Sequence, residues 1–228
     1  MDISPPPSPL ARRLLDIYHR LYAAYGCQHW WPAEAPFEMM VGAILTQSAA
    51  WTNVNKAITN LKTAGALSPA AIRRLPPDEL AAVIRPCGYF NAKAVKLKAL
   101  AEWFGRYNDD IDQFYTADGE SLRRELLNVH GVGPETADSI LLYAAAKPFF
   151  VIDAYTRRIF SRLGLSPKKD SYDAYQRLFA DNLAAEAPLY NEYHALLVKL
   201  AKDACRKQPL CRRCCMGDIC CYNKSNSV

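Results

Sequence analysis

The chain has 228 residues, half of them hydrophobic, and a formal net charge of +5. This apolar content supports a buried core and excludes wholesale disorder. The modest basic excess favours a polyanionic partner, although an ordinary enzyme can carry the same charge.

The chain begins MDISPPPSPL, which has neither the basic region nor the apolar region of a signal peptide. No stretch approaches the roughly 18 uninterrupted apolar residues of a membrane span. We therefore expect a cytoplasmic protein with no membrane partner, in a compartment where thiols stay reduced.

Apolar residues recur at helical spacing along nearly the whole chain, beginning with a face that contains Leu14, Ile17 and Leu21. No segment of useful length alternates as a β-strand does, and no repeat is present. The sequence therefore predicts an all-α fold. After the first segment, which runs to Tyr25, helices are expected over 37–45, 51–61, 68–75, 77–84, 92–104, 121–129, 134–146, 153–163, 172–183 and 190–204. The residues after Lys207 are expected to be irregular.

Residues 126–137, with the sequence LLNVHGVGPETA, form the most informative segment. A helix stops before Gly131, and a new helix begins with Pro134 at its first position. The glycines allow positive φ, and the N–H groups at the start of a helix suit a phosphate. Such a hairpin would bind the DNA backbone without reading bases. A tight helix connection that needs small residues would explain Gly131 and Gly133 equally well.

An apolar run, Phe149–Ile152, ends at Asp153, twenty residues after Gly133. Aspartate is a favoured N-cap, and a helix N-terminus stabilises its ionised form. An anion held there can stabilise an oxocarbenium-like sugar or help to activate water. Capping and catalysis are therefore compatible interpretations of Asp153.

Together, the His-Gly-Val-Gly hairpin, the Thr-Ala pair, the apolar helix and the Val-Ile-Asp segment resemble the helix-hairpin-helix DNA glycosylase superfamily, which includes endonuclease III. The resemblance extends from about Phe37 to Cys221. It implies two helical domains that flank a DNA-binding groove, with residues 36–147 in one and residues 1–35 and 148–228 in the other. It also implies that Gly131 and Gly133 hold DNA and that Asp153 supports cleavage of the glycosidic bond.

Bifunctional members of this superfamily carry a lysine two residues after the second hairpin glycine, where this chain has Glu135. That lysine forms a Schiff base, which a carboxylate cannot do. The resemblance therefore implies a monofunctional glycosylase that uses water as the nucleophile, with Glu135 as a second candidate catalytic residue. Glu135 is also ordinary in the first turn of a helix. If it lies close to Asp153, one of the two carboxyl groups should protonate more readily than usual.

A glycosylase must take its base out of the stack and hold it between flat surfaces. The candidates are Trp30, Trp31 and Trp51. Core packing is the commoner fate of a tryptophan. The stretch 37–55 resembles the family region whose residue fills the gap left by the flipped base, a role that falls to Gln47. The tryptophans and Glu135 together resemble the 3-methyladenine glycosylase branch, whose cationic substrates stack well on tryptophan.

Six of the eight cysteines lie between residues 205 and 221. A compact set with gaps of five, two and five residues is formed by Cys205, Cys211, Cys214 and Cys220. In a reducing compartment this set indicates a metal site before disulfides. A [4Fe–4S] cluster is favoured, although four thiolates also suit zinc. Endonuclease III-like proteins have six residues in the first gap, so Cys215 or Cys221 could replace a ligand.

The residues and the resemblance together predict a monomeric base-excision-repair glycosylase that acts on double-stranded DNA containing a damaged base. The expected substrate is an alkylated purine such as 3-methyladenine. Two alternatives remain open. One is an endonuclease III-like glycosylase and AP lyase that uses another lysine, and the other is a non-catalytic iron–sulfur DNA-binding module. Asp153 argues against the second alternative.

Overall fold

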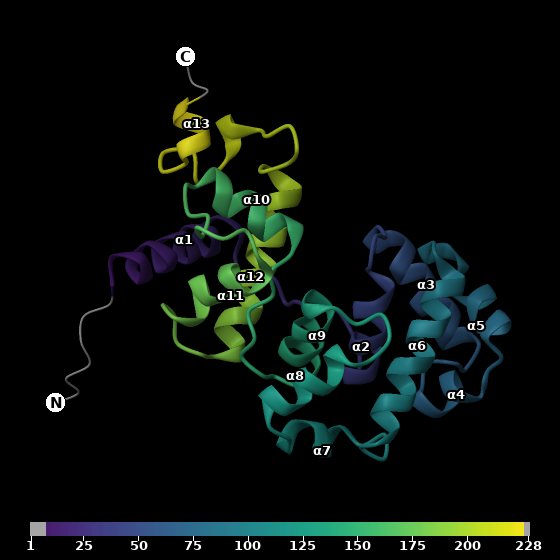
Figure 1. Ribbon diagram of the computed structural model, residues 1–228. Coiled ribbons are helices and arrows are strands. Elements are labelled where there is room, and N and C mark those ends of the chain that lie inside the picture. The colour runs from purple at the N-terminus through teal and green to yellow at the C-terminus, as the bar shows by residue number, and fades with distance from the viewer. Residues whose placement is uncertain (1–7, 226–228) are drawn as a thin grey trace. The chain divides into compact units, whose positions relative to one another are not determined.

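The computed structural model describes residues 8–225, so most of the stretch examined for a signal peptide lies outside the described residues. The chain divides into two compact units. The central unit is Trp31–Lys147, and the terminal unit combines the residues up to Trp30 with those from Pro148 onward. Every regular element in the described residues is a helix, which confirms the predicted all-α class (Figure 1). No helix in this part of the chain is both long and apolar enough to cross a membrane.

Prolines and short polar side chains begin most of the helices, because a proline in the first turn sacrifices no hydrogen bond and a polar side chain can satisfy an N–H group there. Proline is the first residue of α1 (Pro9–Tyr25), α2 (Pro36–Leu45), α4 (Pro69–Arg74), α5 (Pro77–Val83) and α9 (Pro134–Ser139). Side-chain caps are provided by Ser8, Ser68, Asp110, Asp118, Asp153 and Ser171.

The central unit is built around α2, whose residues from Glu38 to Leu45 are all buried. It is packed by α3 (Trp51–Thr63), α6 (Phe90–Gly105) and the π-helical turn Ile140–Ala144 that continues α9 (Figure 1). Helices α4 and α5 cover α6, and α8 (Gly119–Leu127) packs against α9. The short 3-10 turn Arg85–Cys87 packs against α3 and α6. The arrangement places the α2–α3 loop beside the α8–α9 hairpin, to which it is hydrogen-bonded.

The terminal unit packs α1 and α10 (Ala154–Arg162) against α12 (Ala187–Asp203). Its core is aromatic: Phe150 stacks on Phe179 of α11 (Tyr172–Ala180) with ring centroids 3.6 Å apart. The Tyr193 hydroxyl donates to the Leu14 carbonyl oxygen at 2.9 Å and so joins α12 to α1. This core fixes the N-terminus of α10, where Asp153 lies.

Several short elements differ from the sequence-based expectations. Helix α7 (Ile111–Thr116) was not predicted, because its six residues bury a single side chain, Phe114. The region after Lys207 was expected to be irregular throughout, yet it contains a 3-10 turn at Cys211–Arg213 and α13 (Cys221–Ser225). The segment predicted as one helix over 134–146 changes from α to π geometry at Ile140.

Candidate functional site

The hairpin between α8 and α9 has the geometry that its glycines require. Gly131 adopts φ +81°, and a Cβ there would collide with the aliphatic carbons of Lys96. Gly133 caps α9 with φ −97°, is exposed, and would have no atom within 4 Å of an added Cβ. Conformation and packing therefore demand glycine only at 131, whereas at 133 the fold would accept a side chain.

Gln47 joins the α2–α3 loop to the hairpin. Its Nε2 donates to the Gly131 carbonyl oxygen and to the Thr136 hydroxyl, both at 3.0 Å. Its Oε1 accepts from the Lys96 Nζ at 2.6 Å. The amide thus holds the hairpin in place, and its predicted role in filling a gap in the DNA stays a prediction. The next residue, Ser48, is exposed in the loop with φ +52°.

Trp31 and Trp51 lie together in the central unit. Their rings meet edge to face with centroids 5.3 Å apart, and Tyr143 from the π-helical turn lies 5.5 Å from Trp31. The indole of Trp31 covers Gly42, where an added Cβ would meet it at 3.3 Å. All three aromatic side chains are half-buried, so this cluster combines packing with accessible ring surface.

Trp30 belongs to the terminal unit. The Lys202 Nζ lies 5.7 Å from the centroid of the Trp30 ring, a cation–π distance. Partial burial lowers the pKa of Lys202, and the negative charge of Asp153 opposes that shift. The two adjacent tryptophans therefore have different surroundings, one aromatic and one cationic.

Asp153 caps α10 and carries a charge in a largely buried place. Its Oδ1 accepts from the Thr156 backbone N–H at 2.7 Å, and its Oδ2 lies 3.7 Å from the His194 Nε2. Burial raises the pKa of Asp153, but the His194 imidazole and the Thr156 N–H lower it by more. The net result is a pKa below the ordinary value, so Asp153 is an anion at neutral pH.

Glu135 is exposed in the first turn of α9 in the central unit, and its carbonyl oxygen accepts from the Ser139 hydroxyl at 2.7 Å. Asp153 lies in the terminal unit. A coupled titration of Glu135 and Asp153 remains a prediction.

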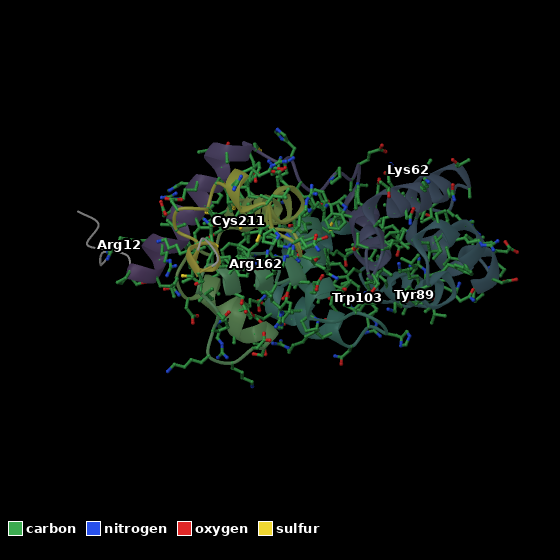
Figure 2. The ribbon with its side chains drawn as sticks, turned by 90° about the horizontal axis from the view of Figure 1, so that it is seen from above. Arg12, Lys62, Tyr89, Trp103, Arg162 and Cys211 are labelled. Carbon is green, nitrogen blue, oxygen red and sulfur yellow. The ribbon has the colours of Figure 1, made fainter. Side chains whose placement is uncertain are left out.

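The four cysteines predicted as ligands surround one hollow in the terminal unit. Its wall contains all four of Cys205, Cys211, Cys214 and Cys220. Arg162 and Cys211, both labelled in Figure 2, lie on this wall. Burial and the neighbouring thiols raise the pKa of Cys214 to about 11.

The two remaining C-terminal cysteines do not line this hollow. Cys215 faces the Tyr25 hydroxyl of α1, and the exposed Cys221 donates to the Leu163 carbonyl oxygen at 3.4 Å. Arg162 instead approaches the hollow, with its Nη1 3.2 Å from the Cys205 Sγ and 2.6 Å from the Arg206 carbonyl oxygen. The set with gaps of five, two and five residues is therefore the one that faces a common space.

The spacing of the cysteines bears on the kind of metal that they could hold. Within residues 8–225, no three His, Cys, Asp or Glu side chains are close enough to share one metal ion. A single zinc ion requires four sulfur atoms at about 2.3 Å from the metal. A polynuclear cluster places its thiolates at separate iron atoms and so spreads them around a larger body. Four cysteine thiols around one hollow are a donor set that suits an iron–sulfur cluster.

Comparison with known proteins shows the family to which the chain belongs. A family model described as HhH-GPD superfamily base excision DNA repair protein matches residues 41–185. The chain belongs to this superfamily. A relative from Methanocaldococcus jannaschii, provisionally described as a DNA repair glycosylase, is 45% identical over 90% of this chain and 94% of its own. Endonuclease III of Sulfolobus acidocaldarius is 29% identical over 83% of each chain.

A solved HhH-GPD structure extends the comparison. The H. pylori 3-methyladenine DNA glycosylase bound to 1,N6-ethenoadenine superposes with a TM-score of 0.72 at 27% identity. The alignment covers 85% of this chain and 97% of that one. The HhH-GPD fold is thereby present over most of the chain, and the hairpin and Asp153 both fall within the part matched by the family model.

Several residues near the predicted site were missed by the sequence analysis. Lys96, Tyr143, His194 and Lys202 all contact predicted site residues or influence their charge. Each comes from a segment distant in sequence from its partner, and none belongs to a local motif. Helical periodicity places these residues on helices but does not reveal which neighbours they face.

The contrast between the two hairpin glycines gives a matched test. We expect Gly131→Ala to lower the free energy of unfolding by about 1–3 kcal/mol, because alanine must adopt positive φ against Lys96. Gly133→Ala should change it by less than about 1 kcal/mol. Urea denaturation of the two variants would measure both values. Equal losses would mean that the hairpin glycines share one structural role.

Proposed function

We propose that this protein is a DNA glycosylase that hydrolyses the N-glycosidic bond of a damaged base, an alkylated purine such as 3-methyladenine, and that it acts as a monomer without AP lyase activity. The observation that carries the proposal is the anionic Asp153, held at the N-terminus of α10 by Thr156 and His194. Such an anion can face the positive charge that develops on the sugar as the base departs.

In the proposed reaction the C1′–N bond breaks, and its electron pair leaves with the base. A water oxygen forms the new bond at C1′, and a proton of that water passes to a carboxylate or to solvent. Asp153 stabilises the oxocarbenium-like sugar and orients the water. A cationic alkylated purine leaves as a neutral base, which lowers the demand for an additional acid.

Two features support the choice of substrate. The half-buried rings of Trp31, Trp51 and Tyr143 offer aromatic surface on which a cationic base can stack. The second feature is the likeness to the 3-methyladenine glycosylase, whose structure was solved with a modified adenine. Trp30 differs from these residues, because the Lys202 ammonium lies over its ring.

We also propose a [4Fe–4S] cluster in the hollow lined by the four cysteines. Cys205, Cys211, Cys214 and Cys220 would be its ligands, and the Arg162 guanidinium would donate to the Cys205 sulfur. A bound cluster would cross-link the C-terminal segment and supply a one-electron couple, and base removal as proposed uses neither property.

An endonuclease III-like lyase is the second candidate function, and one observation favours it. Lys202 lies within the electrostatic influence of Asp153 and has a lowered pKa, so a larger fraction of its amine is neutral than is usual for lysine. A neutral amine can attack the aldehyde of an abasic sugar.

The experiment that tests the main proposal is base release from duplexes with alkylated, oxidised and deaminated bases, each assayed with and without alkali. We expect release of alkylated purines by the wild type, with abasic products revealed only by alkali. Asp153→Asn should lower single-turnover release by on the order of a hundredfold, since it removes the charge but keeps a capping oxygen. Asp153→Ser is the control for capping. If the folded Asp153→Asn variant releases the base at an unchanged rate, Asp153 serves only as a helix cap.

Borohydride trapping separates the two candidate functions. We expect no covalent complex between wild-type protein and abasic DNA, because Glu135 cannot form an imine. Glu135→Lys, which restores an amine at this position, is the positive variant. Trapping by the wild type that disappears in Lys202→Met would establish the lyase alternative.

The cluster is tested by two neighbouring substitutions. We expect Cys214→Ser to lose most of its iron and visible absorbance, whereas Cys215→Ser keeps both. The reason is that Cys214 lines the hollow and Cys215 does not. Iron analysis and absorption spectra of anaerobically purified protein provide the measurement. Zinc in the wild type, or equal iron loss in the two variants, would contradict the assignment.

A further inference from the structure

Helix α12 presents an imidazole to the N-terminus of α10. The His194 Nε2 lies 3.7 Å from the Asp153 Oδ2, and the two side chains are only 7% and 14% exposed, respectively. Water therefore screens this pair weakly, and their interaction is stronger than that of an exposed pair. Forty-one residues separate the two in sequence, so the fold of the terminal unit is what brings them together.

The two oxygens of Asp153 have different partners. Oδ1 accepts the Thr156 N–H, and Oδ2 faces His194. The Thr156 contact is a hydrogen bond, and the His194 Nε2, at 3.7 Å, is the polar neighbour on the side of the other oxygen. The carboxylate thus lies between the N-terminus of α10 on one side and the His194 ring of α12 on the other.

The other charged groups around Asp153 have separate roles. Lys202, also on α12, contributes positive charge. On α10, Arg157 pairs with Asp170 at 2.6 Å, and the Arg158 Nε donates to the Cys205 carbonyl oxygen at 2.9 Å. His194 is therefore the group with the shortest contact to Oδ2 among these neighbours.

We propose that His194 is a positioning residue that orients the Asp153 carboxylate and keeps it deprotonated for base removal. The inference depends on the proposed function in so far as it concerns turnover. It adds to that function a residue which touches neither the sugar nor the base and acts only through Asp153.

The sign of the expected pH effect follows from the opposing causes at Asp153. Burial alone raises the pKa of Asp153, and His194 with Thr156 reverses that shift. A depressed pKa means that the carboxylate stabilises the fold above its unfolded-state pKa, and that this contribution is lost as the pH falls through the folded-state value. Without His194, the carboxyl group should protonate at a higher pH.

The first test compares pH profiles of single-turnover base release. His194→Phe fills a similar volume without a polar atom, and we expect its acid limb to move upward by about one pH unit or more. His194→Gln keeps an N–H donor, so its base-release rate at neutral pH should be closer to that of the wild type than the rate of His194→Phe. His19→Gln, on the exposed surface of α1, is the matched control. Superimposable profiles for the wild type and His194→Phe would overturn the inference.

The second test is independent of activity. Asp153→Asn is made in the wild type and in His194→Phe, and the midpoint of thermal unfolding is measured from about pH 4 to pH 8. We expect Asp153→Asn to raise the midpoint in the His194→Phe background, where the buried anion lacks its partner, and not in the wild type. The same change in both backgrounds would overturn the inference. If the two backgrounds respond differently to Asp153→Asn but the wild type releases no base, the proposed function is wrong while His194 is still supported as the partner of Asp153.

Discussion

A buried carboxylate destabilises a fold unless hydrogen bonds and opposite charge replace the water that it loses, and Asp153 imposes this constraint on the terminal unit. The backbone of α10 supplies one hydrogen bond, through Thr156, and α12 supplies the His194 imidazole beside Oδ2 and the positive charge of Lys202. The aromatic core around Phe150 and Phe179 fixes the segment that leads into this site. Packing and electrostatics therefore act on the same few residues.

The same two helices also reach the cysteine hollow. Helix α12 ends at Asp203, two residues before Cys205, and the Arg158 and Arg162 side chains of α10 bind the backbone and sulfur of the cysteine segment. That segment has only short helices of its own, so its shape depends on contacts such as these and on any cluster that it holds. An iron–sulfur cluster would thus stabilise a region in which regular secondary structure is sparse.

Local chemistry explains why much of the fold could be predicted from the sequence. Proline at first helical positions and apolar residues at helical spacing are local signals, and most predicted helices are present near their expected bounds. Helix α7 was not predicted, because six residues around one buried phenylalanine give too short a hydrophobic pattern. The hairpin and Asp153 could be singled out as candidates because they belong to motifs that are compact in sequence. Gln47 shows the limit of such reasoning, since its hydrogen bonds to Gly131 and Lys96 join segments that lie far apart.

Glu135 in place of a lysine changes what the remaining site must accomplish. An amine nucleophile would itself attack the sugar and hold the product as an imine, so charge on a nearby carboxylate would be one contribution among several. When water is the nucleophile, the stabilisation of positive charge on the sugar falls mainly on an anion. That anion must stay ionised although it is largely buried, so hydrogen-bond donors and polar partners around it have to replace the water that it loses. In the function that we propose, His194 on α12 is such a partner, and it would connect Glu135 in the hairpin to a feature of the fold that lies outside the hairpin.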